Sequence, residues 1–201
     1  MIPVLAVEDP VSAREMLARV FGFVPAGGGC MALGGQSVAV IRWGAVPDDL
    51  LRIRLDHVAF ATADADATCA EFDARGAHLA RAFTPDGPRD IPEFWDNGVR
   101  FVFFDGPDGW PLEFCMKKGR PGRTGHDHFA IRTADIGADE ARLRTIGAAL
   151  VARHRLCTDT APVNVRFLAL GTDMFEVFDE GPYPFVDPDR GWIGLIQSES
   201  L

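Results

Sequence analysis

The apolar residues of this chain gather in short runs separated by aspartate, glycine and proline, a pattern typical of strands joined by turns. In the middle of the chain such runs are DHVAFATAD (56–64), HLARAF (78–83), GVRFVFF (98–104) and WPLEFCM (110–116). Apolar residues recur at helical spacing over 65–75, between the first run and the second. The pattern predicts a unit of one strand, one helix and three further strands.

The same unit is written again further along the chain. DHFAIRTAD (127–135) shares six of its nine residues with DHVAFATAD, and a helical stretch follows it at 138–146. The runs ALVARH (149–154), NVRFLAL (164–170) and DMFEVFD (173–179) then come in the order of their counterparts. We therefore interpret these two parts of the chain as copies of one βαβββ module.

The ends of both predicted helices are also marked. Asp64 and Asp135 directly precede them, where a carboxylate can accept hydrogen bonds from the free amides of the first turn. Gly76 and Gly147 follow them, in the place of a left-handed residue that ends a helix. These residues support one helix in each module.

The N-terminal part of the chain reads as a third, more divergent copy. IPVLAVEDP (2–10) predicts a strand, and apolar spacing predicts a helix over 12–20. The runs FGFVP (21–25), CMAL (30–33) and QSVAVIRW (36–43) predict three strands between glycine-rich turns. This copy has the order of the other two.

We divide the chain into modules at 1–46, 53–118 and 124–181, followed by an unclassified C-terminal tail at 182–201. The predicted fold class is α+β, built from tandem βαβββ modules. Repeats of this length generally cannot bury their apolar face alone, so we expect the modules to pack against one another.

Composition narrows the range of partners. Hydrophobic residues make up 47% of the chain and charged residues 24%, typical of a soluble globular protein. A net charge of −9 argues against nucleic acid or an anionic membrane surface as partner, because both select for basic patches. No apolar run reaches the roughly 18 residues of a membrane span. The four cysteines form no CxxC pair and the first residues do not resemble a secretory signal, so we expect a cytoplasmic protein with reduced thiols.

Two histidines and two glutamates stand at equivalent places in the modules at 53–118 and 124–181. His57 and His128 lie on the first strand, and Glu113 and Glu176 on the last. A pseudo-twofold axis between these modules would bring all four side chains toward one point. Paired imidazoles and carboxylates suit a divalent metal such as Zn, Ni, Co, Mn or Fe.

Less specific interpretations of these residues stay open. A single histidine on a strand is more often a structural residue than a ligand, and duplication could leave paired residues without a role. The N-terminal copy argues against inheritance alone, because it holds Val4 at the histidine position and is apolar near Val40, at the glutamate position. We therefore regard the N-terminal module as degenerate and without metal ligands.

At this level of pattern the chain resembles the vicinal oxygen chelate superfamily, which includes glyoxalase I, methylmalonyl-CoA epimerase, extradiol dioxygenases and bleomycin-binding proteins. LDHVAFAT (55–62) and DGPDGWPLEF (105–114) carry the resemblance best, and RVFGFVP (19–25) adds to it. The resemblance implies a cup-shaped mixed sheet, with the helices outside and a metal inside.

Carried over by position, the resemblance implies His57, Glu113, His128 and Glu176 as metal ligands, with Glu113 or Glu176 as the catalytic base. It favours an enzyme: a metal-dependent lyase, isomerase or epimerase that converts a small oxygen-rich substrate through a metal-stabilised enolate. One alternative is an Fe(II) extradiol-type dioxygenase. The other is a metal-free protein that binds a small molecule, as resistance proteins do.

Other residues have two readings each. His126 lies two residues before His128 on the same face, so it is a candidate substrate-binding residue or alternative base beside the metal, or an exposed histidine at the strand entry. Arg132 is a candidate ligand for an anionic substrate group or a member of a salt bridge. Cys115 lies two residues from Glu113 and is either a residue near the metal or, as we favour, a buried small residue. Part of the aromatic cluster between 94 and 114 could line a substrate pocket.

The third module lacks a partner within the chain. Two-fold dimers are the commonest assembly, so we expect a homodimer in which the N-terminal module meets its symmetry mate.

Overall fold

The computed structural model describes residues 1–119, 126–157, 161–179 and 190–197. The N-terminal module contains β1 (Ile2–Val7), α1 (Pro10–Phe21), β2 (Val24–Pro25), β3 (Cys30–Leu33) and β4 (Gln36–Arg42). The second contains β5 (His57–Ala61), α2 (Ala65–Ala74), β6 (Arg89–Ile91), β7 (Val99–Asp105), the 3-10 turn η1 (Pro107–Gly109) and β8 (Pro111–Lys117). The third contains β9 (His126–Arg132), α3 (Ile136–Thr145), β10 (Ala149–Leu156), β11 (Val163–Leu170) and β12 (Asp173–Phe178), and β13 (Gly191–Ile196) follows.

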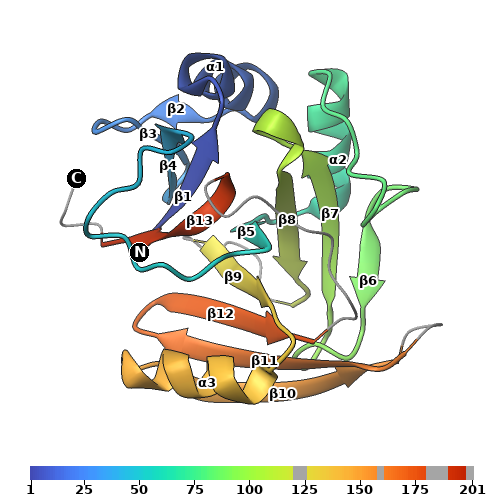
Figure 1. Cartoon of the computed structure of the whole chain (residues 1–201). Helices are drawn as coiled ribbons and strands as arrows, with labels where there is room; N and C mark the ends of the chain where they lie inside the picture. The colour runs from blue at the N-terminus through green and yellow to red at the C-terminus, as the bar shows by residue number, and fades with distance from the viewer. Residues whose placement is uncertain (120–125, 158–160, 180–189, 198–201) are drawn as a thin grey trace.

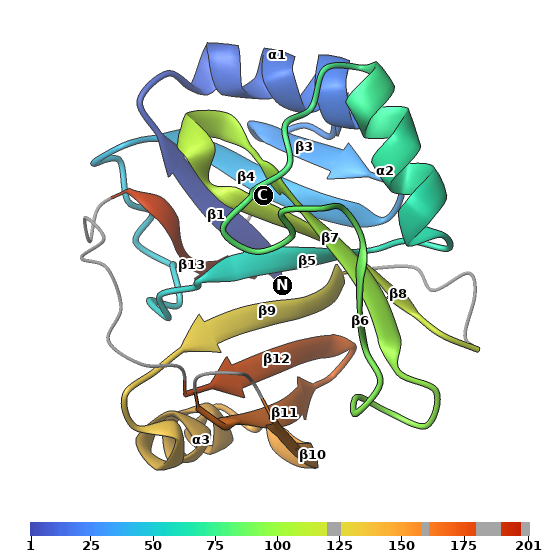
Figure 2. The ribbon, with the colours of Figure 1, turned by 90° about the vertical axis from the view of Figure 1, so that its right-hand side faces the viewer.

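The second and third modules share one mixed sheet with the strand order β10-β11-β12-β9-β5-β8-β7-β6. Strands β5 and β9 run antiparallel in its middle, and each is flanked by the last strand of its own module in parallel (Figure 2). The sheet curls, so that β10 to β12 lie across the end of β7 and β8 (Figure 1). The expected α+β fold with a cup-shaped mixed sheet is confirmed.

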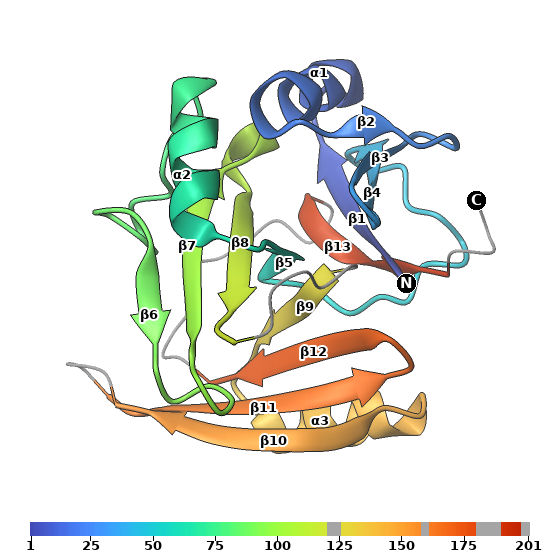
Figure 3. The same ribbon diagram turned by 180° about the vertical axis from the view of Figure 1, so that it is seen from behind.

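The two faces of this sheet differ in what covers them. Helix α2 contacts β7 and β8, and α3 contacts β11 and β12, both on the outer face (Figure 3). Apolar side chains that alternate along the strands fill that side; Phe60, Phe114 and Phe129 are among those fully buried there. The concave face is left for the side chains of the opposite alternation, which include the predicted ligands.

The helix ends follow the sequence marks. The carboxylate of Asp64 accepts hydrogen bonds from the amides of Asp66 and Ala67, and Asp135 caps α3 in the same way. Gly76 and Gly147 adopt positive φ angles of 88° and 95°. Each module therefore turns from its first strand into its helix through the same local chemistry.

One predicted strand does not form. Residues 78–83 make a single bridge, between Leu79 and Phe104, and then turn. The reason lies in Thr84, whose hydroxyl oxygen accepts a hydrogen bond from the amide of Phe103 at 3.0 Å. A side chain thus occupies the backbone group that a continuing ladder would need, and β6 takes the edge of the sheet instead.

The N-terminal module forms a second sheet with the strand order β13-β1-β4-β3-β2. Strand β13 pairs antiparallel with β1, just as β9 pairs with β5. The edge of β1 that corresponds to the β5–β9 contact is therefore covered by a strand of the same chain (Figure 1). Of the tail at 182–201, residues 182–189 and 198–201 lie outside the described residues.

Val4 is fully buried in an apolar cluster that also contains Ala39 and Ile193. The place that holds a histidine in the other modules is thus used for packing here. No helix among the described residues is long and apolar enough to cross a membrane.

Candidate metal centre

Strand pairing places the four predicted ligands around two alanines. Ala59 of β5 pairs with Glu113 on one side and His128 on the other. Ala130 of β9 pairs with Glu176 on one side and His57 on the other. Paired residues point to the same face of a sheet, so all four side chains project from the concave face. The methyl groups of the alanines leave the space between them open.

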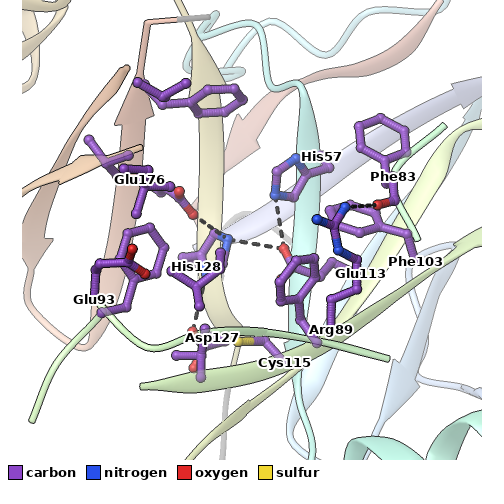
Figure 4. Close-up of a pocket in the computed structure, with 18 of the residues that line it drawn as sticks. His57, Phe83, Arg89, Glu93, Phe103, Glu113, Cys115, Asp127, His128 and Glu176 are labelled. Carbon is purple, nitrogen blue, oxygen red and sulfur yellow. Dashed lines mark hydrogen bonds and ion pairs between the residues drawn. The ribbon is translucent and has the colours of Figure 1, made fainter. Parts of the chain in front are cut away.

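Three of these side chains converge closely. The Nε2 atom of His57 lies 2.9 Å from Oε2 of Glu113, and the Nε2 atom of His128 lies 3.2 Å from the same oxygen (Figure 4). One ligand atom from each of the three lies within 4.8 Å of the others. Two imidazoles and one carboxylate therefore face a common point.

Glu176 contacts this group of three residues only through His128. Its Oε2 atom lies 2.8 Å from Nε2 of His128 (Figure 4). The group whose ligand atoms all lie within 4.8 Å of one another consists of His57, Glu113 and His128, and does not include Glu176. The structure thus brings together all four predicted ligands, with Glu176 at the margin.

The other ring nitrogen of each histidine is held by the aspartate before it in the sequence. Nδ1 of His57 lies 2.8 Å from Oδ1 of Asp56, and Nδ1 of His128 lies 3.1 Å from Oδ2 of Asp127. An ionised carboxylate only accepts hydrogen bonds, so the proton stands on Nδ1. Both Nε2 atoms are buried, and what faces them among the described residues is glutamate oxygens at ion-pair distance, without an aligned hydrogen bond. These nitrogens and the glutamate oxygens fit a divalent cation.

The charges of the cluster also favour a bound cation. Burial alone lowers the pKa of His57, but the carboxylates of Asp56 and Glu113 outweigh it and raise this pKa to about 9. Burial raises the pKa of Glu113, but the charges of His128 and His57 outweigh it and lower this pKa to about 2. Without a metal, the carboxylates therefore retain protons on the imidazoles. A bound cation would take the place of that positive charge.

The cluster lies in the wall of a cavity of about 520 Å³. Aromatic side chains from both modules make up much of the remaining lining: Phe83, Phe94, Trp95, Phe101, Phe103, Phe167 and Phe178. The prediction that part of the aromatic cluster lines a pocket is confirmed for Phe94, Trp95, Phe101 and Phe103, whereas Phe104 and Phe114 belong to the core under the helices.

No protein-family model matches the sequence, and no curated protein matches it. Solved structures do. A point mutant of glyoxalase I from Zea mays has a TM-score of 0.68 at 13% identity, over 94% of this chain and 71% of that one. Glyoxalase I from Zea mays itself has a TM-score of 0.64 at 14% identity, over 96% and 70%. A mutant of 4-hydroxymandelate synthase from Streptomyces coelicolor has a TM-score of 0.58 at 14% identity, over 94% and 73%.

The chain has the vicinal oxygen chelate fold. At these identities the likeness establishes the fold, and the chemistry rests on the side chains of this chain. In the vicinal oxygen chelate fold of this protein, the cup is formed by the second and third modules, and the N-terminal module stands beside it with β13.

His126 does not lie where strand alternation predicted. A β-bulge between β5 and β9 pairs Ala59 with His128 but Phe60 with His126, which leaves Asp127 as an extra residue. The ring of His126 therefore lies on the outer face, 5.6 Å from the ring of Phe60, and is not part of the cavity lining. Burial lowers the pKa of His126 to about 4, so the ring is neutral.

Arg132 does line the cavity, but it is engaged with a carboxylate. Its Nε atom lies 2.8 Å from Oδ2 of Asp56, and its guanidinium lies over the ring of Phe178 at 5.6 Å. Of the two interpretations of Arg132, the salt bridge is therefore the one that its position fits. Cys115 is buried beside the site, and burial raises the pKa of its thiol well above the usual range.

Sequence reasoning missed two residues of the site. Asp56 and Asp127, which hold the histidines, lie inside the repeated DH dipeptide. Their repetition was visible in the sequence, but strand alternation suggests that neighbouring residues face opposite ways. Repetition of both letters was the signal that could have identified them.

Proposed function

We propose that this chain is a metal-dependent lyase or isomerase, including epimerases, of the glyoxalase type, which acts on a small oxygen-rich substrate. The observation that supports it is the convergence of His57, Glu113 and His128 within 4.8 Å in the wall of a cavity. Buried, protonatable groups in a cavity are where functional chemistry concentrates.

His57, Glu113 and His128 would hold the metal, and Glu176 stands beside them. A bound divalent cation polarises a substrate carbonyl and stabilises negative charge on its oxygen. The proton beside that carbonyl needs a carboxylate acceptor. Glu176 is the better candidate, because Glu113 lies close to both imidazoles and Glu176 close to only one.

The cavity favours a substrate with an apolar or aromatic body. Phe83, Phe101 and Phe103 line one side, and the rings of Phe83 and Phe103 stack with centroids 4.6 Å apart. Arg89 also lines the cavity (Figure 4). Arg132 is less suited to hold an anionic group, since Asp56 already pairs with it.

The test combines metal content with proton exchange. Plasma mass spectrometry on the untagged protein should find about one metal per chain, and His57→Ala should lose it. His126→Ala is the matched control, because His126 lies outside the cavity, and it should keep the metal. In D₂O, the loaded protein should exchange the proton beside the carbonyl in a panel of 2-hydroxyketones, as followed by NMR, and Glu176→Gln should abolish this. Equal metal content in all three proteins, or none after reconstitution, would contradict the proposal.

A second candidate is an Fe(II) dioxygenase. The close group of two histidines and one carboxylate favours it, because such a triad leaves open coordination positions for oxygen and substrate. Anaerobic loading with Fe(II) followed by catechols and an oxygen electrode distinguishes the two. Oxygen uptake that needs His57 supports the dioxygenase, whereas proton exchange without oxygen supports the isomerase. Binding of aromatic compounds without any metal would leave the metal-free binding protein.

A homodimer and a cytoplasmic location stay predictions. Because β13 covers the edge of β1, a dimer through the N-terminal module would have to use another surface. Light scattering tests the dimer, and a monomer at high concentration would contradict it.

A further inference from the structure

We propose that Asp56 and Asp127 are positioning residues for the metal site, and that each is held by a cation from the opposite module. They keep Nε2 of each histidine aimed at the metal and thereby set its affinity. The inference rests on the proposed metal site, but it concerns residues that do not contact the metal.

The first chain of contacts runs from the third module to the second. Arg132 of β9 reaches Oδ2 of Asp56 with its Nε atom at 2.8 Å. The other oxygen of Asp56 lies 2.8 Å from Nδ1 of His57. One carboxylate is thus divided between a guanidinium and an imidazole.

The second chain runs the opposite way. Lys117 of β8, in the second module, places Nζ 3.4 Å from Oδ1 of Asp127 in the third. The other oxygen of Asp127 lies 3.1 Å from Nδ1 of His128 (Figure 4). This chain is the more deeply buried of the two, since the side chains of Lys117 and Asp127 are 7% and 3% exposed. The ammonium also lies over the ring of Trp95 at 4.4 Å.

Each series of contacts, from cation to aspartate to histidine, favours one tautomer of its histidine. The neighbouring cation orients the aspartate carboxylate, so that one of its oxygens faces Nδ1 as a hydrogen-bond acceptor. With a metal bound, Nδ1 would then carry the proton, and the lone pair of Nε2 would be left for the metal. Hydrogen bonding to a carboxylate also makes the imidazole more electron-rich and hence a stronger ligand.

Because the two series of contacts cross between the modules, the geometry of the ligands depends on how the modules pack. Each histidine is held by a cation that belongs to the other half of the cup, so the orientation of both rings depends on how the halves dock. The bulge in β9 also helps to orient His128. Asp127 is the extra residue of the bulge, and this allows its side chain to reach the histidine beside it. In a regular strand, that side chain would point to the helices.

The experiment measures metal affinity and imidazole protons in the full chain. Asp56→Asn, Asp127→Asn and Lys117→Met are loaded with Co(II) in competition with a chelator, beside wild type. We expect the dissociation constant of each to rise by about 10- to 100-fold, with a changed Co(II) visible spectrum. Arg100→Met is the matched control: Arg100 pairs with Asp66 at 2.7 Å outside the cavity, and its loss should leave the affinity unchanged.

Nδ1–H resonances of the metal-free protein give a second readout. Wild type should show two downfield imidazole protons, and each Asp→Asn variant should lose or shift the one of its own histidine. If Lys117→Met fails to fold because Asp127 stays buried with its charge, Lys117→Arg and the double variant with Asp127→Asn replace it. Lys117→Arg should restore affinity, and the neutral double variant should fold and bind weakly.

The outcomes separate this inference from the proposed function. Metal affinities within two-fold of wild type in both aspartate variants overturn the inference and leave the metal site standing. Wild type that binds no metal overturns the proposed function, and the Nδ1–H resonances then decide alone whether the aspartates hold the rings: their absence overturns that as well.

Discussion

Strand β13 completes the N-terminal module, and Trp192 is the side chain by which its contribution can be measured. Trp192 is fully buried, and its Nε1 donates a hydrogen bond of 3.0 Å to the carbonyl oxygen of Pro111 in β8. The indole therefore joins the small sheet to the strand that carries Glu113. Replacing it with alanine removes both the packing and the hydrogen bond.

The expected loss of stability follows from the buried area. An indole buries about 200 Å², which at ~25 cal/mol/Å² is worth about 5 kcal/mol. A compact unfolded state reduces this by roughly 10–40%, and the lost hydrogen bond adds back about 1 kcal/mol. Trp192→Ala should thus lower the free energy of unfolding by about 4–5.5 kcal/mol, at the upper end of the usual range for large core truncations.

Urea denaturation followed by circular dichroism measures this loss, and the chain offers a matched control. Trp43 is 42% exposed and so buries a smaller area, and Trp43→Ala should cost roughly half as much as Trp192→Ala. In a thermal scan, Trp192→Ala should lower the midpoint by roughly 8–22 °C. If the two variants lost the same stability, Trp192 would not be packed as described and β13 would not complete the module.

Three further predictions concern the site and the same strand. Glu113→Gln should lower metal content at least about tenfold, measured by plasma mass spectrometry; unchanged content would exclude Glu113 as a ligand. The pKa of His57 is raised to about 9 in the folded protein. Protonated His57 therefore contributes of order 3 kcal/mol to the free energy of unfolding. This contribution is fully present below pH 6.5 and is lost as the pH rises through 9. Metal-free protein should therefore unfold in less urea at pH 9.5 than at pH 6, and the opposite order would refute the charge argument. Gly191→Ala places a methyl group against the ring of Trp110 at a φ of 86°, and should cost at least about 2 kcal/mol. Gly27→Ala, with a φ of 81° and nothing within 4 Å, is the control for φ alone.

The convergence of these four side chains could be predicted because duplication and strand alternation act together. His57 and His128 occupy the same place in two copies, and so do Glu113 and Glu176, so one pseudo-twofold axis relates both pairs. Alternation then decides the face for all four at once. What the pattern did not contain is the distance between them, which separates the close group from Glu176 at its margin.

Features that depend on pairing between distant segments were out of reach. Strand β13 lies at the far end of the chain from β1, and no local signal links its sequence, GWIGLI, to that edge. The predicted strand at 78–83 failed for a related reason, because the hydroxyl of Thr84 takes the backbone group of Phe103. In both cases local propensity is compatible with a strand, and only a non-local partner decides the outcome.

The repeated DH dipeptide shows why an interaction can be read from a sequence when its geometry cannot. In both modules the aspartate holds its own histidine by Nδ1. Asp56 does so from the bend just before β5, whereas Asp127 does so from inside β9, where the bulge turns it toward the cavity. The two copies have equal length, so the bulge leaves no trace in their alignment. The same dipeptide thus makes the same Asp–His contact in both modules, although the backbone conformation around it differs. The property that the two modules share is therefore the contact and not the strand geometry.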